Sequence, residues 1–246
     1  MSRMKFGAFL APHHPIGEHP MLQLRSDLDL AERLDQLGFD EFWCGEHHST
    51  GWEVIASPEM FLAAAGERTH RIKLGTGVVS LPYHHPFIVA QRMVQLDHMT
   101  NGRAIFGSGP GALPSDAYVL GIDPLTQRDR QDEALGVIRR LLAGEERFSH
   151  KSDWFTLNDA RLQLLPLQRD DKDDMLEQSA TGRLRSPSQR EEGESHPPSC
   201  KMMSTPSRSA AVKVHTHTLK SMKVFKSKHV ILYFSRQLFI SFSDTS

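Results

Sequence analysis

Hydrophobic residues follow two alternating patterns over the first two-thirds of the chain. Four runs are short, apolar and bounded by turn residues, as buried β-strands are, and they cover residues 4–10, 41–44, 72–80 and 103–108. Longer segments between them carry apolar residues at the three- and four-residue intervals of amphipathic helices. The two patterns alternate roughly every thirty residues, which is the order that builds βα units on a parallel sheet. The sequence therefore predicts an α/β fold.

Turn and capping residues mark the ends of the expected helices. Six leucines from Leu22 to Leu37 predict a first helix, which ends at Gly38 because glycine readily adopts the left-handed C-cap conformation. Three further helices are expected, and their start or stop signals are the N-cap pair Ser57-Pro58, Pro86 with a later Asn101-Gly102, and the stretch 129–142 closed by Gly144.

Composition narrows the classes of function only slightly. The 246 residues carry a formal net charge of −1, so the charge does not favour nucleic acid as a partner. The chain has no apolar stretch of about eighteen residues and runs from Met1 directly into a strand, which predicts a cytoplasmic protein with no membrane partner. Cys44 is expected to be buried in a strand. Because Cys200 lies in a part of different composition, neither a disulfide nor a cysteine-based metal site is expected.

The composition changes after Gln168. The sequence there becomes charged, rich in serine and interrupted by proline, beginning with residues 169–174. Such a segment cannot bury enough apolar surface to order itself. An apolar run at 230–242, interrupted by Arg236, is too short to span a membrane. We therefore predict a domain at 1–168 and an unrelated tail without stable structure at 169–246.

The first candidate for chemistry is Glu46-His47-His48, directly after the second predicted strand. In an α/β barrel the carboxyl ends of the strands carry the active site. Two adjacent imidazoles on an extended backbone point in different directions, so one is expected to face the site while the other packs or bonds to a loop. The helical i, i+4 spacing of a two-histidine metal site is missing and no third ligand is evident, so no metal is predicted. A structural pair and an acid/base role both remain open.

Two glycine-rich segments end the third and fourth predicted strands. Residues 75–82 and 107–111 place small residues where the backbone closely approaches a ligand or simply packs and turns, and the sequence leaves both alternatives open. The second segment differs from a dinucleotide-binding loop, because Pro110 lacks an amide donor and the third glycine comes too early. With no Walker loop and no Gly-x-Ser-x-Gly elbow, nicotinamide-binding, nucleotide triphosphatase and hydrolase functions lose their usual support.

Taken together, the motifs resemble the bacterial luciferase-like monooxygenases. The resemblance is carried, in order, by residues 4–9, 38–43, Glu46-His47-His48, 75–77, 96–99 and Gly102-Arg103. Three further segments are similar to the limonene monooxygenase branch of that family, namely 107–116, 121–124 and 153–157. The resemblance covers residues 4–168.

The resemblance implies a TIM (β/α)8 barrel that uses reduced FMN. In this family FMNH2 is supplied in trans by a separate NAD(P)H-dependent flavin reductase. It captures O2 as a flavin C4a-hydroperoxide, and one oxygen atom passes to a small apolar substrate. The protein would keep the site dry and hold the substrate.

The resemblance also assigns roles to individual residues. His47 stands at the position of the catalytic histidine, and a non-proline cis peptide is expected between Gly77 and Val78, under the isoalloxazine ring. Gly109 and Pro110 are expected to face the flavin. Pro110 replaces an arginine that many relatives carry, so no flavin contact from a side-chain cation is expected there.

The sequence departs from the family after the fourth βα unit. No fifth strand, phosphate-binding loop or later barrel strand is recognisable after residue 168, as in a truncated or frameshifted gene. A half-barrel leaves its first and fourth strands as unpaired edges, so we expect a marginal or aggregating fold unless two copies pair as a homodimer.

Two alternative functions follow from the same barrel. One is a deazaflavin-dependent oxidoreductase, which transfers hydride without oxygen. The other is a non-catalytic truncated homologue, or an accessory subunit that pairs with an intact homologue.

Overall fold

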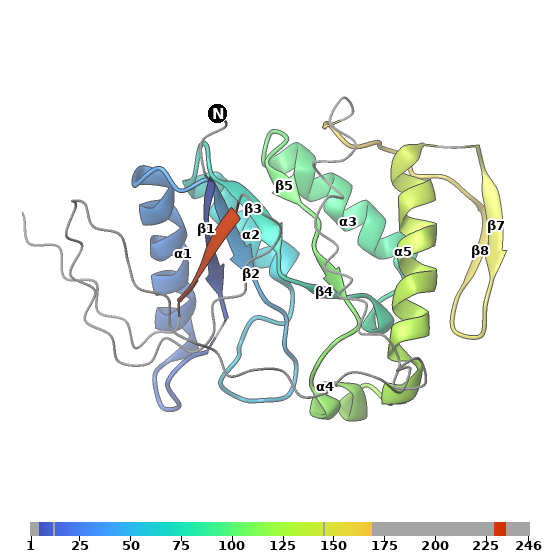
Figure 1. Cartoon of the computed structure of the whole chain (residues 1–246), viewed down its shortest axis with the longest axis horizontal. Coiled ribbons are helices and arrows are strands. Elements are labelled where there is room, and N and C mark those ends of the chain that lie inside the picture. Colours follow the sequence, from blue (N-terminus) through green and yellow to red (C-terminus); the bar gives the residue numbers. More distant parts are fainter. Residues whose placement is uncertain (1–4, 12, 145, 169–228, 235–246) are drawn as a thin grey trace, which may run out of the picture.

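The computed structural model describes residues 5–11, 13–144, 146–168 and 229–234, and these form an α/β structure (Figure 1). A five-stranded parallel sheet has the order β5-β3-β2-β1-β9. Its strands are β1 (Lys5–Leu10), β2 (Glu41–Cys44), β3 (Lys73–Thr76), β5 (Ala104–Ile105) and β9 (His229–Phe234). A short parallel pair joins β4 (Val79–Ser80) to β6 (Ser108–Gly109), and an antiparallel hairpin joins β7 (Phe148–Lys151) to β8 (Thr156–Ala160).

Helices alternate with the strands as the sequence predicts. They are α1 (Pro20–Gln36), α2 (Pro58–Arg68), α3 (Pro86–Met99), α4 (Pro114–Val119) and α5 (Gln127–Ala143), with 3-10 turns η1 (Leu81–Tyr83) and η2 (Pro124–Thr126). The stop signals are confirmed, because Gly38, Asn101 and Gly144 all have positive φ. Ser57 occupies the N-cap position of α2, but its side chain makes no capping hydrogen bond. Helix α4 and the β7–β8 hairpin were not predicted.

The third and fourth predicted strands are each divided into two pieces, at Gly77-Val78 and at Phe106-Gly107. The Thr76 hydroxyl fills the gap in the ladder, since it donates to Gly107 O at 2.8 Å and accepts from Gly107 N at 3.0 Å. A Cβ at Gly107 would lie 2.1 Å from Thr76 O, so only glycine fits this close approach. After the break, each strand continues as a second short piece that leads into the loops at the carboxyl end of the sheet.

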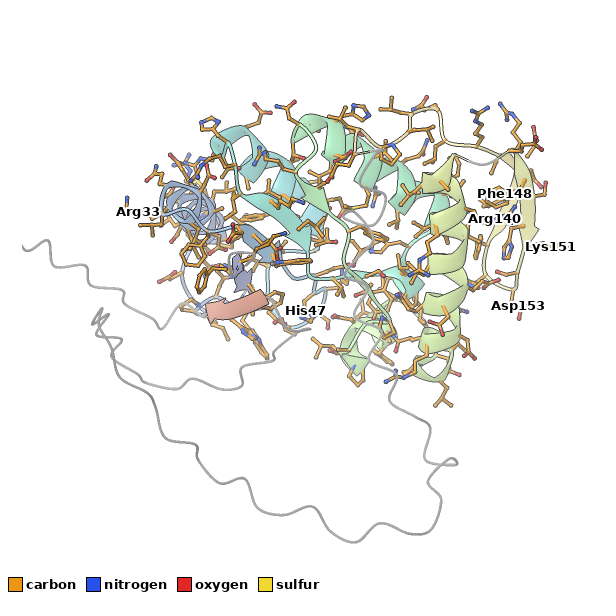
Figure 2. All side chains as sticks on the ribbon, turned by 45° about the horizontal axis from the view of Figure 1, so that its top comes forward. Arg33, His47, Arg140, Phe148, Lys151 and Asp153 are labelled. Atoms are coloured by element: carbon orange, nitrogen blue, oxygen red, sulfur yellow. The ribbon has the colours of Figure 1, made fainter. Side chains whose placement is uncertain are left out.

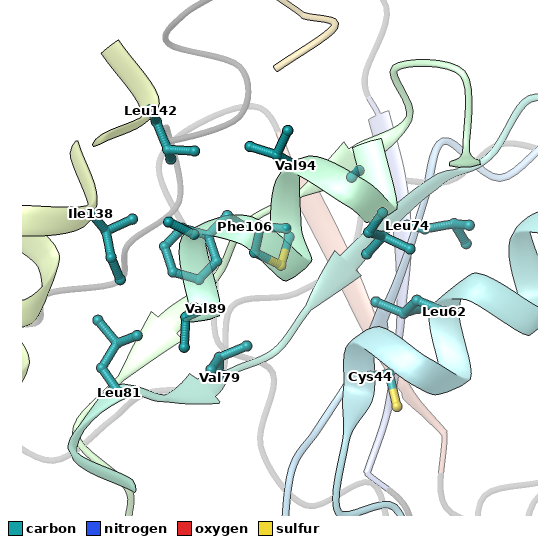
Figure 3. Packing of buried hydrophobic residues seen from close by; sticks show 14 of the residues in the cluster. Cys44, Leu62, Leu74, Val79, Leu81, Val89, Val94, Phe106, Ile138 and Leu142 are labelled. Atoms are coloured by element: carbon teal, nitrogen blue, oxygen red, sulfur yellow. The ribbon is translucent and has the colours of Figure 1, made fainter. Parts of the chain in front are cut away.

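The core lies between the sheet and helices α2, α3 and α5 (Figure 3). Leu62, Leu74, Val89 and Ile138 come from different elements and are each at most 2% exposed. Full burial of such a side chain contributes about 1.5–3 kcal/mol. Cys44 also belongs to this cluster, as predicted, and burial raises the pKa of its thiol. Cys200 lies outside the described residues.

The hairpin packs on the outer side of α5 (Figures 1 and 2). The Arg140 guanidinium of α5 lies 3.8 Å from the ring centre of Phe148, a cation–π contact. Glu133 of the same helix accepts hydrogen bonds from His150 Nε2 at 2.9 Å and Trp154 Nε1 at 2.7 Å. These contacts extend the folded part beyond α5.

The segment after the hairpin is bound as far as Gln168. The buried Asp97 carboxylate accepts from Leu167 N at 2.7 Å and from Gln168 N at 3.2 Å. Gln168 Nε2 also donates to Ala104 O at 2.9 Å. Residue 168 is therefore anchored to α3 and β5, at the place where the composition changes. The division into a domain at 1–168 and a tail at 169–246 stays a prediction.

The expectation that the first strand is an unpaired edge is wrong. Strand β9 pairs with β1 in parallel over six residues, from Lys5↔His229 to Leu10↔Phe234. The segment is rich in apolar, β-branched and aromatic residues, which suit a strand, and β1 offers it unpaired backbone groups. Six residues of the predicted unstructured tail thus form a strand, and the others, 169–228 and 235–246, lie outside the described residues. The sheet is open among the described strands, ending at β5 and β9.

Candidate active site

The loop that follows β2 carries Glu46-His47-His48 and lies beside helix α4, at the end of the molecule where the strands terminate (Figure 1). Figure 2 shows His47 at this position. Its backbone N–H donates to Ile55 O at 3.1 Å, which closes the loop on itself. A local hydrogen bond therefore holds the backbone of the predicted catalytic histidine, independently of its side-chain contacts.

The His47 imidazole lies between two buried carboxylates. Nδ1 is 3.2 Å from Asp116 Oδ2, and Nε2 is 3.4 Å from Glu53 Oε1. The side chain remains 24% exposed. Contacts on both ring nitrogens fix the plane of the ring, so the structure holds His47 in one orientation at the edge of the site.

Asp116 ties three consecutive residues of the loop to α4. Besides contacting His47, it accepts from His48 N at 3.1 Å and from Ser49 Oγ at 2.5 Å. Burial of Asp116 acts to raise the pKa of its carboxyl group, but hydrogen bonds from Ser49, His47 and His48 outweigh this and hold the pKa below its ordinary value. Asp116 is thus an ionised anchor for the histidine loop.

His48 turns away from His47 and bonds to Glu46. Glu46 Oε1 lies 2.7 Å from both His48 Nε2 and His84 Nε2, and Oε2 accepts from Ser80 N at 2.7 Å. The side chain of Glu46 is fully buried, which acts to raise its pKa, yet bonds with the two imidazoles lower the pKa to about 2. The hydrogen bond with Glu46 also raises the pKa of His48. The predicted divergence of the two adjacent histidines is confirmed.

His84 is a site residue that the sequence did not reveal. It lies 38 positions beyond Glu46, and the three side chains form a group that could surround a metal ion. Tetrahedral ligands about 2.0–2.1 Å from Zn²⁺ are roughly 3.3 Å apart. The 2.7 Å contacts are shorter than that spacing and fit hydrogen bonds instead. The absence of a metal remains a prediction.

The predicted flavin-facing residues meet beside this network. The peptide bond between Gly77 and Val78 is cis, as the resemblance implies. A Cβ at Gly109 would lie 2.8 Å from Val78 Cγ2, so these two residues are in close contact. The Glu46–Ser80 bond joins the histidine loop to the strand that follows Val78. Gly77, Val78 and Gly109 thus form a floor of small residues connected to the loop of His47.

Pro110 borders this floor through its backbone. Its carbonyl accepts from Gln127 Nε2 at 2.8 Å, and the same nitrogen donates to Tyr83 Oη at 2.9 Å. The left-handed φ of Gly111 brings the chain within reach of Tyr83, where a Cβ would lie 2.3 Å from Oη. Gly111 and Gln127 therefore fix the turn after β6.

Asp116 and Glu53 were also missed as site residues. Asp116 follows Glu46 by about seventy positions, so only the folded chain brings it to His47. Glu53 is in the same loop as His47, but no spacing rule marks it. A groove of about 390 Å³ elsewhere, between α3 and residues 162–164, contains none of the predicted site residues.

Residues 4–173 match the family model described as luciferase-like monooxygenase. The chain belongs to this family. This luciferase-like protein is 62% identical over 166 residues to a 4-hydroxyprotoasukamycin monooxygenase of Streptomyces nodosus subsp. asukaensis. It is 60% identical over 164 residues to a limonene 1,2-monooxygenase of Rhodococcus erythropolis. The resemblance inferred from the motifs is confirmed.

The alignments cover 68% and 67% of this luciferase-like chain but only 45% and 42% of those relatives. The chain thus spans less than half the length of the curated relatives it matches.

Two solved structures share the fold. A type II Baeyer–Villiger monooxygenase, the oxygenating constituent of 3,6-diketocamphane monooxygenase from Pseudomonas putida in complex with FMN, has a TM-score of 0.60 at 27% identity. That alignment covers 70% of this luciferase-like chain and 46% of the other. An F420-dependent secondary alcohol dehydrogenase has a TM-score of 0.57 at 26% identity, over 67% of this chain and 50% of the other.

Among the described residues, no helix is both long enough and apolar enough to cross a membrane.

Proposed function

We propose that this protein is a monooxygenase that uses FMNH2 supplied by a separate NAD(P)H-dependent flavin reductase. One atom of O2 is inserted into a small apolar substrate and the other leaves as water, so FMNH2, O2 and substrate give FMN, oxidised substrate and H2O. The observation that carries this proposal is the fixed orientation of His47 between Asp116 and Glu53, next to a floor of small residues. The two relatives named monooxygenases support it.

A flavin ring would lie against Gly77 and Val78, which are partly exposed. A Cβ at Gly77 would lie 2.9 Å from Phe9 Cε2, and one at Gly109 would lie 2.8 Å from Val78 Cγ2, so glycine at both positions allows the residues behind this surface to pack closely. We infer that Gly77, Val78, Gly109 and Pro110 hold the isoalloxazine, and a solved relative in complex with FMN supports a flavin as the cofactor. FMN supplies the activation of O2. No phosphate contact is assigned among the described residues.

His47 would act as the acid/base or hydrogen-bonding group of the site. With Nδ1 directed at Asp116, its Nε2 is the nitrogen left to face Glu53 and the site. Asp116 would favour the tautomer with the proton on Nδ1, since a carboxylate stabilises the ring N–H that donates to it. A positioned imidazole typically contributes about 10²–10⁴-fold to the rate of a proton transfer.

Binding of the cofactor is the first test. The purified 246-residue chain is titrated anaerobically with reduced FMN, and the flavin fluorescence is followed. Saturable binding is expected. Absence of binding by folded, soluble protein would show that the monooxygenase activity belongs to its relatives and not to this chain.

The role of His47 is tested in the same preparation by oxygen consumption and by oxygen transfer to an apolar substrate such as limonene. His47→Gln is expected to lower transfer at least about 10²-fold while FMN binding persists. His70→Gln is the matched control, because His70 is exposed and precedes the amino end of β3. Equal losses in both variants would argue against a catalytic role for His47.

Hydride transfer with a deazaflavin is a second candidate function. The structural similarity to an F420-dependent alcohol dehydrogenase favours it. Incubation with reduced F420 and a ketone, with no O2 consumed, would distinguish it from oxygenation.

A non-catalytic role is the third candidate, and the short span relative to the curated relatives favours it. In that role the chain would pair with an intact homologue or with itself. Sedimentation of the chain alone and with a full-length relative measures this association. A monomer that neither binds flavin nor associates would exclude both the monooxygenase function and the accessory role.

A further inference from the structure

A continuous series of acidic and imidazole groups passes through His47. Asp116 Oδ2 lies 3.2 Å from His47 Nδ1, His47 Nε2 lies 3.4 Å from Glu53 Oε1, and Glu53 Oε1 lies 2.9 Å from His13 Nε2. The exposed fractions of these side chains are 3% for Asp116, 24% for His47, 6% for Glu53 and 51% for His13. The series therefore runs from a buried carboxylate to an imidazole in contact with water.

The backbone builds this arrangement from two loops. His13 and Glu53 form an isolated antiparallel bridge, and His14 N donates to Trp52 O at 2.7 Å. Glu53 N donates to Thr50 Oγ1 at 3.1 Å, which fixes the loop at the residue that carries the carboxylate. The loop after β1 is thus paired with the loop after β2 at the point where His13 meets Glu53. The contact between these two side chains follows from local backbone pairing.

A hydrogen bond between His47 Nε2 and Glu53 Oε1 requires one proton more than a neutral imidazole and a carboxylate carry. A neutral imidazole donates from one nitrogen only, and in His47 that nitrogen is taken to be Nδ1, which faces Asp116. The contact between His47 Nε2 and Glu53 Oε1 becomes a hydrogen bond only if one further proton lies between them, on the imidazole or on the carboxyl group. At 3.4 Å this contact is longer than an ideal hydrogen bond, and such contacts in ligand-free sites commonly shorten when the site fills.

We propose that Glu53 and His13 form a proton-transfer path that connects His47 to bulk water. The imidazolium form of His13 passes its Nε2 proton to the Glu53 carboxylate, and the protonated Glu53 passes a proton to His47 Nε2, which becomes an imidazolium. The half-exposed His13, now neutral, is reprotonated by hydronium or a buffer acid. Each carrier is restored, and one proton enters per transfer. The path matters when flavin and substrate exclude water from the exposed side of His47, because His47 must still exchange its proton between turnovers. This inference rests on the proposed function.

The other ionisable groups near His47 do not offer an equivalent path. Asp116 faces Nδ1 from α4 and is bonded to Ser49 and to His48 N. Glu46, His48 and His84 form the separate network on the opposite side of the loop, in which both imidazoles bond to the same carboxylate oxygen. Among the described residues, Glu53 is the carboxylate that contacts both His47 and an imidazole that is half exposed.

The first test needs no catalytic activity. In the 15N-labelled 246-residue chain, the His47 ring signals are assigned by their loss in His47→Gln. Exchange of the His47 ring protons with water is then measured by saturation transfer at saturating oxidised FMN, which would cover the exposed side of His47 and prevent direct exchange from bypassing the path. Glu53→Gln and His13→Gln are each expected to slow this exchange roughly tenfold, because each interrupts the path. His70→Gln is the control and should leave the exchange unchanged. Unaltered exchange in both path variants, with the fold intact by circular dichroism, would overturn the proposal.

The second test uses turnover with reduced FMN. His13→Ala is expected to lower the rate of oxygen transfer and to make it depend on buffer, with added imidazole restoring most of the loss, while FMN affinity is unchanged. A purely structural role of His13 would give no such rescue. Slowed ring exchange in a chain that binds FMN but transfers no oxygen would leave the path established and refute oxygen transfer, whereas a folded chain that binds no FMN would refute the proposed function and the path with it. Full activity without rescue or change in pH profile would refute the path alone.

Discussion

At the amino ends of β3 and β5 the charged side chains of Asp35 and Arg103 are bound mainly by backbone groups. At the carboxyl ends, Glu46 contacts two imidazoles, and Asp116 contacts the His47 imidazole besides a backbone amide and a hydroxyl group. Asp35 accepts from three consecutive amides, and Arg103 donates to five acceptors, which are Thr100 O, Ile72 O, Gly66 O, Thr69 O and Thr69 Oγ1. Backbone groups do not titrate near neutral pH, whereas imidazoles do. The first network can only hold the fold, while the second can also carry protons.

Removing the structural network should have the largest effect on stability. Arg103→Met leaves five acceptors without their donor, and we expect the free energy of unfolding to fall by about 3 kcal/mol, or cooperative unfolding to be lost. Urea denaturation followed by circular dichroism measures the change. Arg25→Met, at an exposed position of α1, is the control and should cost less than about 0.5 kcal/mol. Equal costs would mean that the Arg103 bonds contribute no net stability.

Asp116→Asn should have a smaller effect on stability but a specific effect on the site. The amide keeps one acceptor oxygen and loses the charge, so we expect a cost of about 2 kcal/mol. The ring signals of His47 should broaden as its orientation is released, which an 15N–1H spectrum detects. Asp132→Asn changes an exposed carboxylate of α5 and serves as control. A sharp, unshifted His47 signal in Asp116→Asn would contradict the anchoring role.

The pH dependence of stability should distinguish the two ends of the sheet. Glu46 has a lowered pKa, so its contribution is present above its ordinary value of 4.5 and is lost as the pH falls toward about 2. His48 has a raised pKa, so its contribution is complete below 6.5 and is lost as the pH rises through the folded-state value. Asp35 also has a lowered pKa, so its contribution is present above its ordinary value of 3.8 and is lost as the pH falls below it, which changes stability on the acid side only.

Unfolding free energies measured from pH 2 to pH 9 would check this. His48→Gln should flatten the alkaline side of the curve, and Asp35→Asn should change only the acid side. An alkaline slope that survives in His48→Gln would assign it to another group.

The smallest effect is expected at Ser57, a polar residue near the site that makes no capping bond. Ser57→Ala should cost less than about 0.5 kcal/mol, although loss of a true N-cap typically costs about 1 kcal/mol. Asp123→Ala provides the comparison, because its carboxylate does accept from Leu125 N at 2.9 Å. Thermal unfolding of both variants measures the difference. A cost at Ser57 as large as that at Asp123 would show that its hydroxyl does cap α2 in solution.

The sequence predicted individual elements better than their interruptions. Strand β2 has the predicted bounds, and Gly38 and Gly144 end helices where their left-handed preference indicates. The break of the third strand was not foreseen, because it depends on Thr76 bonding across to Gly107, thirty-one positions away. The β1 edge was misjudged because its partner, β9, comes from a segment whose composition suggested no stable structure.

Only part of the candidate site could be named from the sequence, and its role stays a prediction. His47 and the small residues Gly77, Val78 and Gly109 could be named from motifs, since their residue types and order are local properties of the chain. Asp116 and His84 could not, because their roles depend on contacts with residues 38 to 69 positions away. The carboxylate of Asp116 and the imidazole of His84 become part of the candidate site only because the fold brings them to their partners.

The sequence by itself determined the alternation of strands and helices, the family and the position of one histidine, because hydrophobic period, turn chemistry and local motifs are encoded within a few residues. Only the tertiary structure decided which groups bind that histidine, which side chains form the second imidazole network and what covers the first strand. Those outcomes depend on distances between segments far apart in the chain, and such distances are set by packing of the whole core.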